Sequence, residues 1–168
     1  MTRAPNPIGQ DDHRSPLTLD KGLFNTPFPE GSVAVLRKLT KPTIRILDAD
    51  DYPTILEKVK RILKAHRGFE VVGEARDGKH AVSLAESLKP DVIVINVTMP
   101  KMSGFEAARR IRVPDSAIVI LSTHKDQQFI EEARKVGANG YVEKSDADEQ
   151  LIRAIESTVK GEEFFFVS

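Results

Sequence analysis

The chain has 168 residues, 40% of them hydrophobic, and its 25 lysines and arginines balance 25 aspartates and glutamates. Because it has no cysteine, disulfides, thiolate zinc sites, iron–sulfur clusters and thiol nucleophiles are excluded, and its four histidines show no metal-ligand spacing. Zero net charge argues against a dedicated nucleic-acid binder, and no apolar run could cross a bilayer or form a signal core. We therefore expect a cytoplasmic protein with no membrane partner and no direct nucleic-acid contact.

The first 42 residues hold six of the ten prolines, and the first thirty show neither helical nor strand periodicity. Residues 32–39 could form a short helix or strand, but the sequence shows no apolar face for them to pack against. We expect residues 1–42 to be an N-terminal extension, mostly disordered or loosely packed.

From residue 43 onward, short apolar, β-branched runs alternate with segments of helical period. Several runs are apolar on both faces, which is typical of buried parallel strands. The predicted strands are residues 43–47, 70–75, 92–95, 117–121 and 140–142. Helix-start signals follow each run: Pro53, the turn Asp77-Gly78, the capping box Ser103 and Glu106, and the caps Asp126 and Asp146.

Five strands, each followed by a helix, indicate a doubly wound α/β sheet, because parallel strands need crossover connections. We predict a flavodoxin-like (βα)5 three-layer sandwich with the parallel strand order 2-1-3-4-5. In such a sheet, ligands bind beyond the carboxyl ends of the strands, between strands 1 and 3.

Polar residues follow four of the predicted strands at these ends. They are Asp48, Asp50 and Asp51 after the first strand, Asn96 at the third, Ser122 and Thr123 at the fourth, and Glu143 and Lys144 after the fifth. Carboxylate and amide oxygens are ligands that Mg²⁺ accepts, and a lysine and a hydroxyl can complement phosphoryl oxygens. The pattern predicts a magnesium and phosphoryl pocket that lacks a nucleophilic carboxylate opposite the acid pair.

Six motifs span this part of the chain: IRILDADDYP (44–53), VVGEARDG (71–78), PDVIVIN (90–96), MPKMSG (99–104), ARKVGA (133–138) and GYVEK (140–144). In this order and spacing, residues 43–163 resemble the receiver domain of bacterial two-component response regulators. The resemblance is closest to the subgroup that usually precedes a helix-turn-helix output domain.

The resemblance implies roles for individual residues. Asp50 and Asp51 match the acid pair that holds magnesium, and the backbone carbonyl of Thr98 matches its third protein ligand. Asn96 stands where receivers carry the aspartate that accepts a phosphoryl group from a histidine kinase. The residues that match the switch hydroxyl, its coupled aromatic and the phosphoryl-binding lysine are Ser122, Tyr141 and Lys144.

Asn96 changes the chemistry that the resemblance implies. Formation of an acyl phosphate needs an ionised carboxylate, and a neutral amide oxygen is a much poorer nucleophile. The amide can still offer its oxygen to a metal or accept a hydrogen bond from Lys144. We therefore expect no phosphorylation at residue 96, and a weakened Mg²⁺ site at Asp50, Asp51, Asn96 and Thr98.

Two further features depart from the expected pattern. Asp48 stands where the first strand calls for an apolar residue, and its side chain should share a face with that of Asp50. The three phenylalanines 164–166 lie in an expected C-terminal tail, residues 164–168. They either close over the core or form an exposed interaction surface.

Three functions are consistent with these residues. The first is a stand-alone atypical receiver, or pseudo-receiver, that is not an enzyme. It would contact a histidine kinase or another signalling protein, or form a homodimer through the fourth helix, fifth strand and fifth helix around Tyr141 and Lys144. We favour it because of Asn96 and because only eight residues follow Lys160, too few for a helix-turn-helix.

The second is a conventional phosphoacceptor response regulator, seen as an Asp-to-Asn variant or as the receiver fragment of a DNA-binding regulator. The third is a flavodoxin-like binder of a nucleotide or flavin. The third is disfavoured because no glycine-rich loop follows the first strand, where Asp50 and Asp51 would repel a phosphate.

Overall fold

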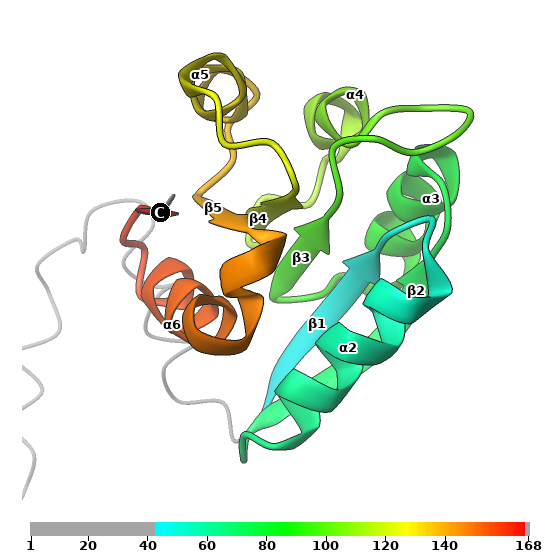
Figure 1. Ribbon diagram of the computed structural model, residues 1–168. Coiled ribbons are helices and arrows are strands. Elements are labelled where there is room, and N and C mark those ends of the chain that lie inside the picture. Colours follow the sequence, from blue (N-terminus) through cyan, green and yellow to red (C-terminus); the bar gives the residue numbers. More distant parts are fainter. Residues whose placement is uncertain (1–42, 167–168) are drawn as a thin grey trace, which may run out of the picture.

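The structure is a computed structural model that describes residues 43–166. Residues 1–42, the expected N-terminal extension, and residues 167–168 lie outside the described part of the chain. Within it, six parallel strands form one sheet in the order β2-β1-β3-β4-β5-β6 (Figure 1). The strands are β1 (Ile44–Ala49), β2 (Phe69–Ala75), β3 (Val92–Ile95), β4 (Ala117–Ser122), β5 (Gly140–Glu143) and β6 (Phe164–Phe166). The predicted flavodoxin-like α/β fold is confirmed, with a sixth strand added to the predicted order.

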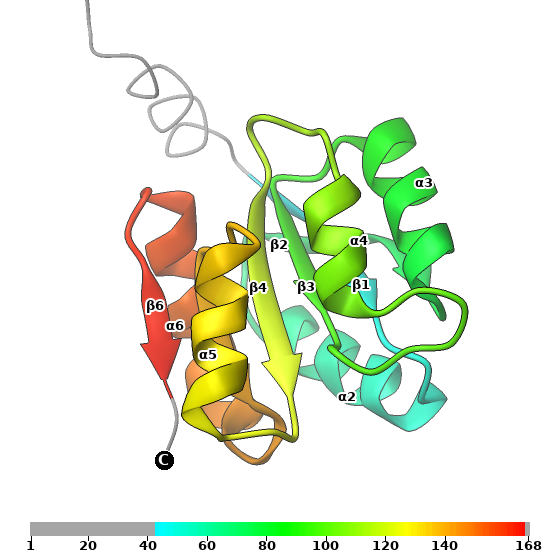
Figure 2. The ribbon, with the colours of Figure 1, turned by 90° about the horizontal axis from the view of Figure 1, so that it is seen from above.

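Helices cover both faces of this sheet. They are α2 (Pro53–Lys64), α3 (Gly78–Leu88), α4 (Gly104–Arg110), α5 (Gln127–Lys135) and α6 (Ala147–Val159), with a 3₁₀ turn, η2 (Lys144–Asp146), before α6. Figures 1 and 2 show α2 and α6 on one face and α3, α4 and α5 on the other. Among residues 43–166, no helix is both long and apolar enough to span a bilayer.

The central strands are buried because both faces pack against helices. On β1, Ile46 belongs to the cluster that contains α2 and α6, whereas Leu47 belongs to the cluster that contains α3 and α4. Every residue of β3 and β4 is buried. Burial of one such isoleucine or leucine side chain contributes about 1.5–3 kcal/mol. The continuous apolar runs of the sequence therefore reflect two-sided packing.

Helix starts agree with the predicted signals in all five cases, although not every predicted cap forms a side-chain hydrogen bond. Pro53 occupies the first turn of α2, the Asp77 side chain accepts a hydrogen bond from His80 N at 2.9 Å, and Ser103 accepts one from Glu106 N at 3.2 Å. The two remaining cap residues lie at the N-cap positions where they were predicted. Asp126 and Asp146 precede α5 and α6, but neither side chain makes a capping hydrogen bond.

β1 is longer than predicted. The predicted first strand ends at Leu47, whereas β1 continues through Asp48 to Ala49. Asp48 lies opposite Glu74 of β2 and Val94 of β3, so it is inside the sheet rather than beyond its end. The charged side chain of Asp48 does not end the strand, because pairing with the neighbouring strands determines how far β1 extends.

Residues 164–166 form β6, where we expected a tail. β6 pairs with β5, and Phe164 N donates to the Asn139 carbonyl oxygen at 2.9 Å. Phe164 packs against the cluster of α2 and α6, whereas Phe165 packs against the opposite cluster, and all three rings remain partly exposed. The rings thus close in part over the core, and an interaction surface at their exposed part stays a prediction. Three identical apolar residues show no alternation, so the sequence pattern could not identify the strand.

Candidate functional site

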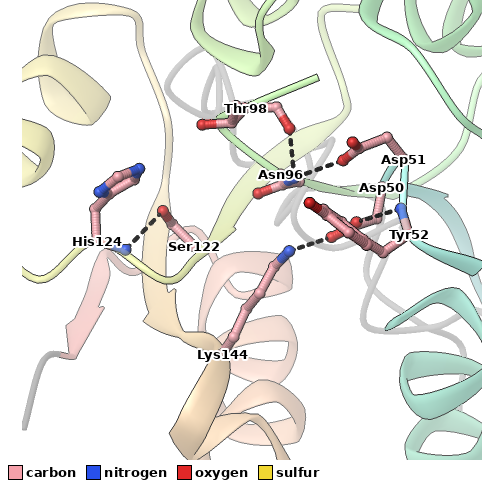
Figure 3. Close-up of polar contacts among 8 residues, drawn as sticks. All are labelled: Asp50, Asp51, Tyr52, Asn96, Thr98, Ser122, His124 and Lys144. Atoms are coloured by element: carbon pink, nitrogen blue, oxygen red, sulfur yellow. Dashed lines mark hydrogen bonds and ion pairs between the residues drawn. The ribbon is translucent and has the colours of Figure 1, made fainter. Parts of the chain in front are cut away.

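The carboxyl ends of β1, β3, β4 and β5 bring the predicted site residues to one end of the sheet (Figure 3). An open pocket of about 390 Å³ lies there. It is lined by Asp51, Tyr52, Thr54, Ile55, Asn96, Thr98, Thr123 and Lys144. The topology therefore places the pocket between strands 1 and 3, as predicted.

Asp50 is buried at the floor of the site, with 1% of its surface exposed. One carboxylate oxygen, Oδ1, accepts a hydrogen bond from Tyr52 N at 2.9 Å. The other, Oδ2, lies 2.5 Å from Lys144 Nζ. This second contact is an ion pair whose angles are not those of a hydrogen bond. Because the Lys144 side chain is only 11% exposed, water screens the pair far less than it screens a surface pair.

Asn96 follows β3 and is 6% exposed. Its amide nitrogen Nδ2 donates to Asp51 Oδ1 at 3.2 Å and to the Thr98 carbonyl oxygen at 2.7 Å. An ionised carboxylate and a carbonyl oxygen only accept hydrogen bonds, so the amide must present its NH₂ group to them. Asn96 thus interacts with Asp51 and Thr98 as a donor. The bond expected from Lys144 to its oxygen does not form, because the Lys144 ammonium pairs with Asp50. Metal ligation by this oxygen stays a prediction.

Asp48 lies next to this site but inside the sheet. It is 1% exposed, and its Oδ2 has no hydrogen-bond partner. Burial raises the pKa of Asp48 well above its usual value, the charges of Asp50 and Glu74 raise it further, and Lys144 opposes the shift. The interaction with Asp50 agrees with the predicted shared face. The raised pKa favours the neutral carboxylic acid.

Ser122 and Tyr141 both interact with the backbone of His124. Ser122 Oγ accepts a hydrogen bond from His124 N at 3.1 Å, and the Tyr141 hydroxyl donates to the His124 carbonyl oxygen at 2.7 Å. Both side chains are fully buried, and burial raises the pKa of Tyr141. The His124 ring is half-buried and stacks on Phe129, with centroids 4.0 Å apart.

Tyr141 and Lys144, around which we expected an interaction face, do not lie on an exposed surface of β5. Tyr141 is buried rather than exposed on β5, and β6 covers the edge of β5. Lys144 faces Asp50 in the site, not a partner surface. A partner that approaches this side of the sheet would meet β6 before β5.

The donor set of the pocket does not fit Mg²⁺ as it is arranged. Magnesium requires a near-octahedral set of oxygens about 2.0–2.1 Å away. The amide protons of Asn96 point at Asp51 and Thr98, and an amide NH₂ has no lone pair for a metal. Lys144 forms an ion pair with Asp50 Oδ2, so this oxygen already has a cationic partner. Among residues 43–166, no group of three or more His, Cys, Asp or Glu side chains is placed to hold a metal ion.

Comparison with known proteins agrees with the fold. The family model of the response regulator receiver domain matches residues 46–156. The chain is 40% identical over 129 residues to the uncharacterized transcriptional regulatory protein YxjL of Bacillus subtilis, covering 76% of this chain and 59% of that protein. It is also 40% identical over 120 residues to the transcriptional regulatory protein DegU of Brevibacillus brevis, covering 70% and 51%. The chain therefore spans little more than half the length of these curated relatives.

Solved structures of response regulators have the same fold as this chain. A two-component response regulator of the LuxR family from Aurantimonas superposes with a TM-score of 0.69 at 36% identity, covering 73% of this chain and 89% of that one. The receiver domain of the putative response regulator NarL from Mycobacterium tuberculosis also gives 0.69, at 29% identity, covering 73% and 100%. The family match, the relatives and the fold agree, and the chain belongs to the response regulator receiver domain family.

Proposed function

We propose that this receiver is a pseudo-receiver: it accepts no phosphoryl group at residue 96, has no enzymatic activity, and acts through contacts with a histidine kinase or another signalling protein. Receiver domains interact with histidine kinases and generally bind Mg²⁺ at the acidic phosphorylation site. The observation that carries the proposal is the Asn96 amide, whose NH₂ group donates to Asp51 and Thr98.

The chemistry of an amide supports this proposal. In a receiver, a carboxylate oxygen attacks phosphorus, an acyl phosphate forms and the donor's leaving group departs. Asn96 has no ionised oxygen for this attack, and its nitrogen lone pair is delocalised into the carbonyl. The substitution also removes one negative charge from the pocket, which should weaken Mg²⁺ binding.

The arrangement around Tyr141 is consistent with signalling that needs no phosphoryl group. The ring is buried and its hydroxyl is bonded to His124, with Ser122 bonded to the same residue. We expect a partner to recognise the surface that this arrangement presents. We expect a homodimer on this side of the sheet to use β6 and α5 rather than the edge of β5.

The relatives support a second proposal. YxjL and DegU are transcriptional regulatory proteins, and this chain spans little more than half of each. The chain could thus be the receiver part of a DNA-binding regulator, whose activity Asn96 would uncouple from phosphorylation. The natural gene tests this idea. An open reading frame that continues past Ser168 supports it, and an aspartate codon at position 96 would make the natural protein a conventional phosphoacceptor.

Treatment with acetyl phosphate and Mg²⁺ tests the main proposal. We expect no mass increase of the natural chain by intact-protein mass spectrometry. Asn96→Asp restores the carboxylate and should gain one alkali-labile phosphoryl group if the rest of the pocket is competent. Stoichiometric phosphorylation of the natural chain at residue 96 would contradict the proposal.

A further inference from the structure

Lys144 pairs with one member of the acid pair rather than with residue 96. Its Nζ lies 2.5 Å from Asp50 Oδ2 and 5.9 Å from the centroid of the Tyr52 ring. Because Asn96 is neutral, it offers the ammonium no opposite charge, and Asp50 is the carboxylate within reach. The ion pair cancels the charge of Asp50, and both side chains are largely shielded from water.

The Asn96 amide satisfies the other side of the pocket. Its two N–H protons are directed at Asp51 Oδ1 and at the Thr98 carbonyl oxygen, 3.2 and 2.7 Å from Nδ2. These are two of the oxygens that the resemblance to receiver domains implies as metal ligands. A divalent cation would have to turn the amide over and break both hydrogen bonds. It would also have to displace Lys144 or lie beside its positive charge.

We infer that Lys144 and the Asn96 amide take the place of the divalent cation, so that this site keeps its form without Mg²⁺. The inference rests on the proposed function, because it explains how a receiver without a phosphoacceptor neutralises its acidic site. It also implies a signalling surface that does not respond to changes in Mg²⁺ concentration.

Four single substitutions in the full chain test the inference. Lys144→Met removes the internal cation but keeps an unbranched apolar stem, and Asn96→Asp replaces the NH₂ donor by a charge. Lys125→Met and Gln128→Glu are the matched controls, since both residues are exposed and the changes in charge are the same. The melting temperature of each protein is measured in EDTA and in millimolar Mg²⁺.

The natural chain should melt at the same temperature in both buffers, and so should each control. Lys144→Met should melt several degrees lower than the natural chain in EDTA, and Mg²⁺ should recover part of that loss. Asn96→Asp should likewise gain several degrees from Mg²⁺. If Mg²⁺ stabilised the natural chain as much as Asn96→Asp, or if Lys144→Met behaved like Lys125→Met, the inference would be wrong.

A Mg²⁺ titration of the natural chain, followed by the amide NMR shifts of Asp51, Asn96 and Thr98, decides the matter even if Lys144→Met does not fold. Unchanged shifts support the inference, and saturating shifts overturn it. The phosphorylation assay separates this outcome from the proposed function. Saturable Mg²⁺ binding without phosphorylation would remove the inference alone, whereas phosphorylation at residue 96 would remove the proposed function.

Discussion

Asp48 places a carboxyl group in the interior of β1, where the sequence pattern calls for an apolar side chain. It is 1% exposed, Oδ2 has no hydrogen-bond partner, and Asp50 and Glu74 are both close enough to raise its pKa. An unsatisfied buried polar group costs about 1–3 kcal/mol. Asp48 is therefore a destabilising residue: its Oδ2 has no hydrogen-bond partner among the described residues, and Lys144 offsets the effect of burial only in part.

Replacing Asp48 should stabilise the protein. We expect Asp48→Leu to raise the free energy of unfolding by about 1–3 kcal/mol at neutral pH, because the leucine removes a buried polar group. Urea unfolding measures the change. Asp115→Leu, at an exposed position, serves as the control and should stay within about 0.5 kcal/mol of the natural chain. A destabilised Asp48→Leu would show that this carboxyl group is needed by the site.

The positions of individual site residues could be predicted only in part. The sequence predicted that Asp50, Asp51, Asn96 and Lys144 lie together, because residues at the carboxyl ends of parallel strands meet at one edge. It could not predict which atom of the Asn96 amide faces Asp51, or that Lys144 forms its ion pair with Asp50. Both depend on differences of a few ångströms between side chains from separate strands, which no local pattern encodes.

At the scale of elements, β6 depends on contacts with both helices beside it. The Arg134 guanidinium lies 3.7 Å from the centroid of the Phe165 ring and pairs with Glu163, and Arg153 lies 5.9 Å from the centroid of Phe164. Gly161, with φ of +84°, turns the chain after α6. The long-range pairing with β5, rather than local propensity, makes these three residues a strand.

Gly140 allows the close approach of β6. A Cβ atom at this position would lie 3.0 Å from the Phe164 carbonyl oxygen and 3.4 Å from Thr158 Cγ2. Gly140→Ala should therefore push β6 away from β5, destabilise the protein by about 1–3 kcal/mol, and speed hydrogen exchange at residues 164–166. Native-state exchange measured by NMR tests this.

Gly73→Ala is the matched control for that experiment. Gly73 lies on β2 at the opposite edge of the sheet, where its added Cβ would meet the movable Leu88 Cδ1 at 2.7 Å. This variant should leave exchange at residues 164–166 unchanged. Equal protection of β6 from hydrogen exchange in Gly140→Ala and in the natural chain would show that the pairing of β6 with β5 does not need a glycine at position 140.

At the scale of the whole molecule, the fold was more predictable than its edges. Apolar runs buried on both faces, such as 92–95 and 117–121, have one stable solution, a parallel sheet between two helix layers. The connectivity then follows from right-handed crossovers. The extra edge strand and the extension of β1 through Asp48 were missed, because each is set by its neighbours in the sheet rather than by its own residues.

The charges of the described domain also predict how its stability depends on pH. Lys101 lowers the pKa of Asp77, and Lys58 lowers the pKa of Asp148, each mainly through a hydrogen bond between the two side chains. A lowered pKa stabilises the fold above the unfolded value of about 3.9 and loses that effect as the pH falls. Asp48, whose pKa is raised, behaves in the opposite way: its contribution is complete below about 3.9 and is lost as the pH rises.

These opposed contributions should give the natural chain its greatest stability at weakly acidic pH. Asp48→Leu removes only the contribution that fades as the pH rises, so its maximum should move toward neutral pH while its acid limb stays in place. Urea unfolding across the pH range measures both curves. Added salt should flatten the acid limb, because the Lys58–Asp148 and Lys101–Asp77 pairs are partly exposed and therefore screened. Identical pH profiles for the two proteins would mean that Asp48 has the same pKa in the folded and unfolded chains.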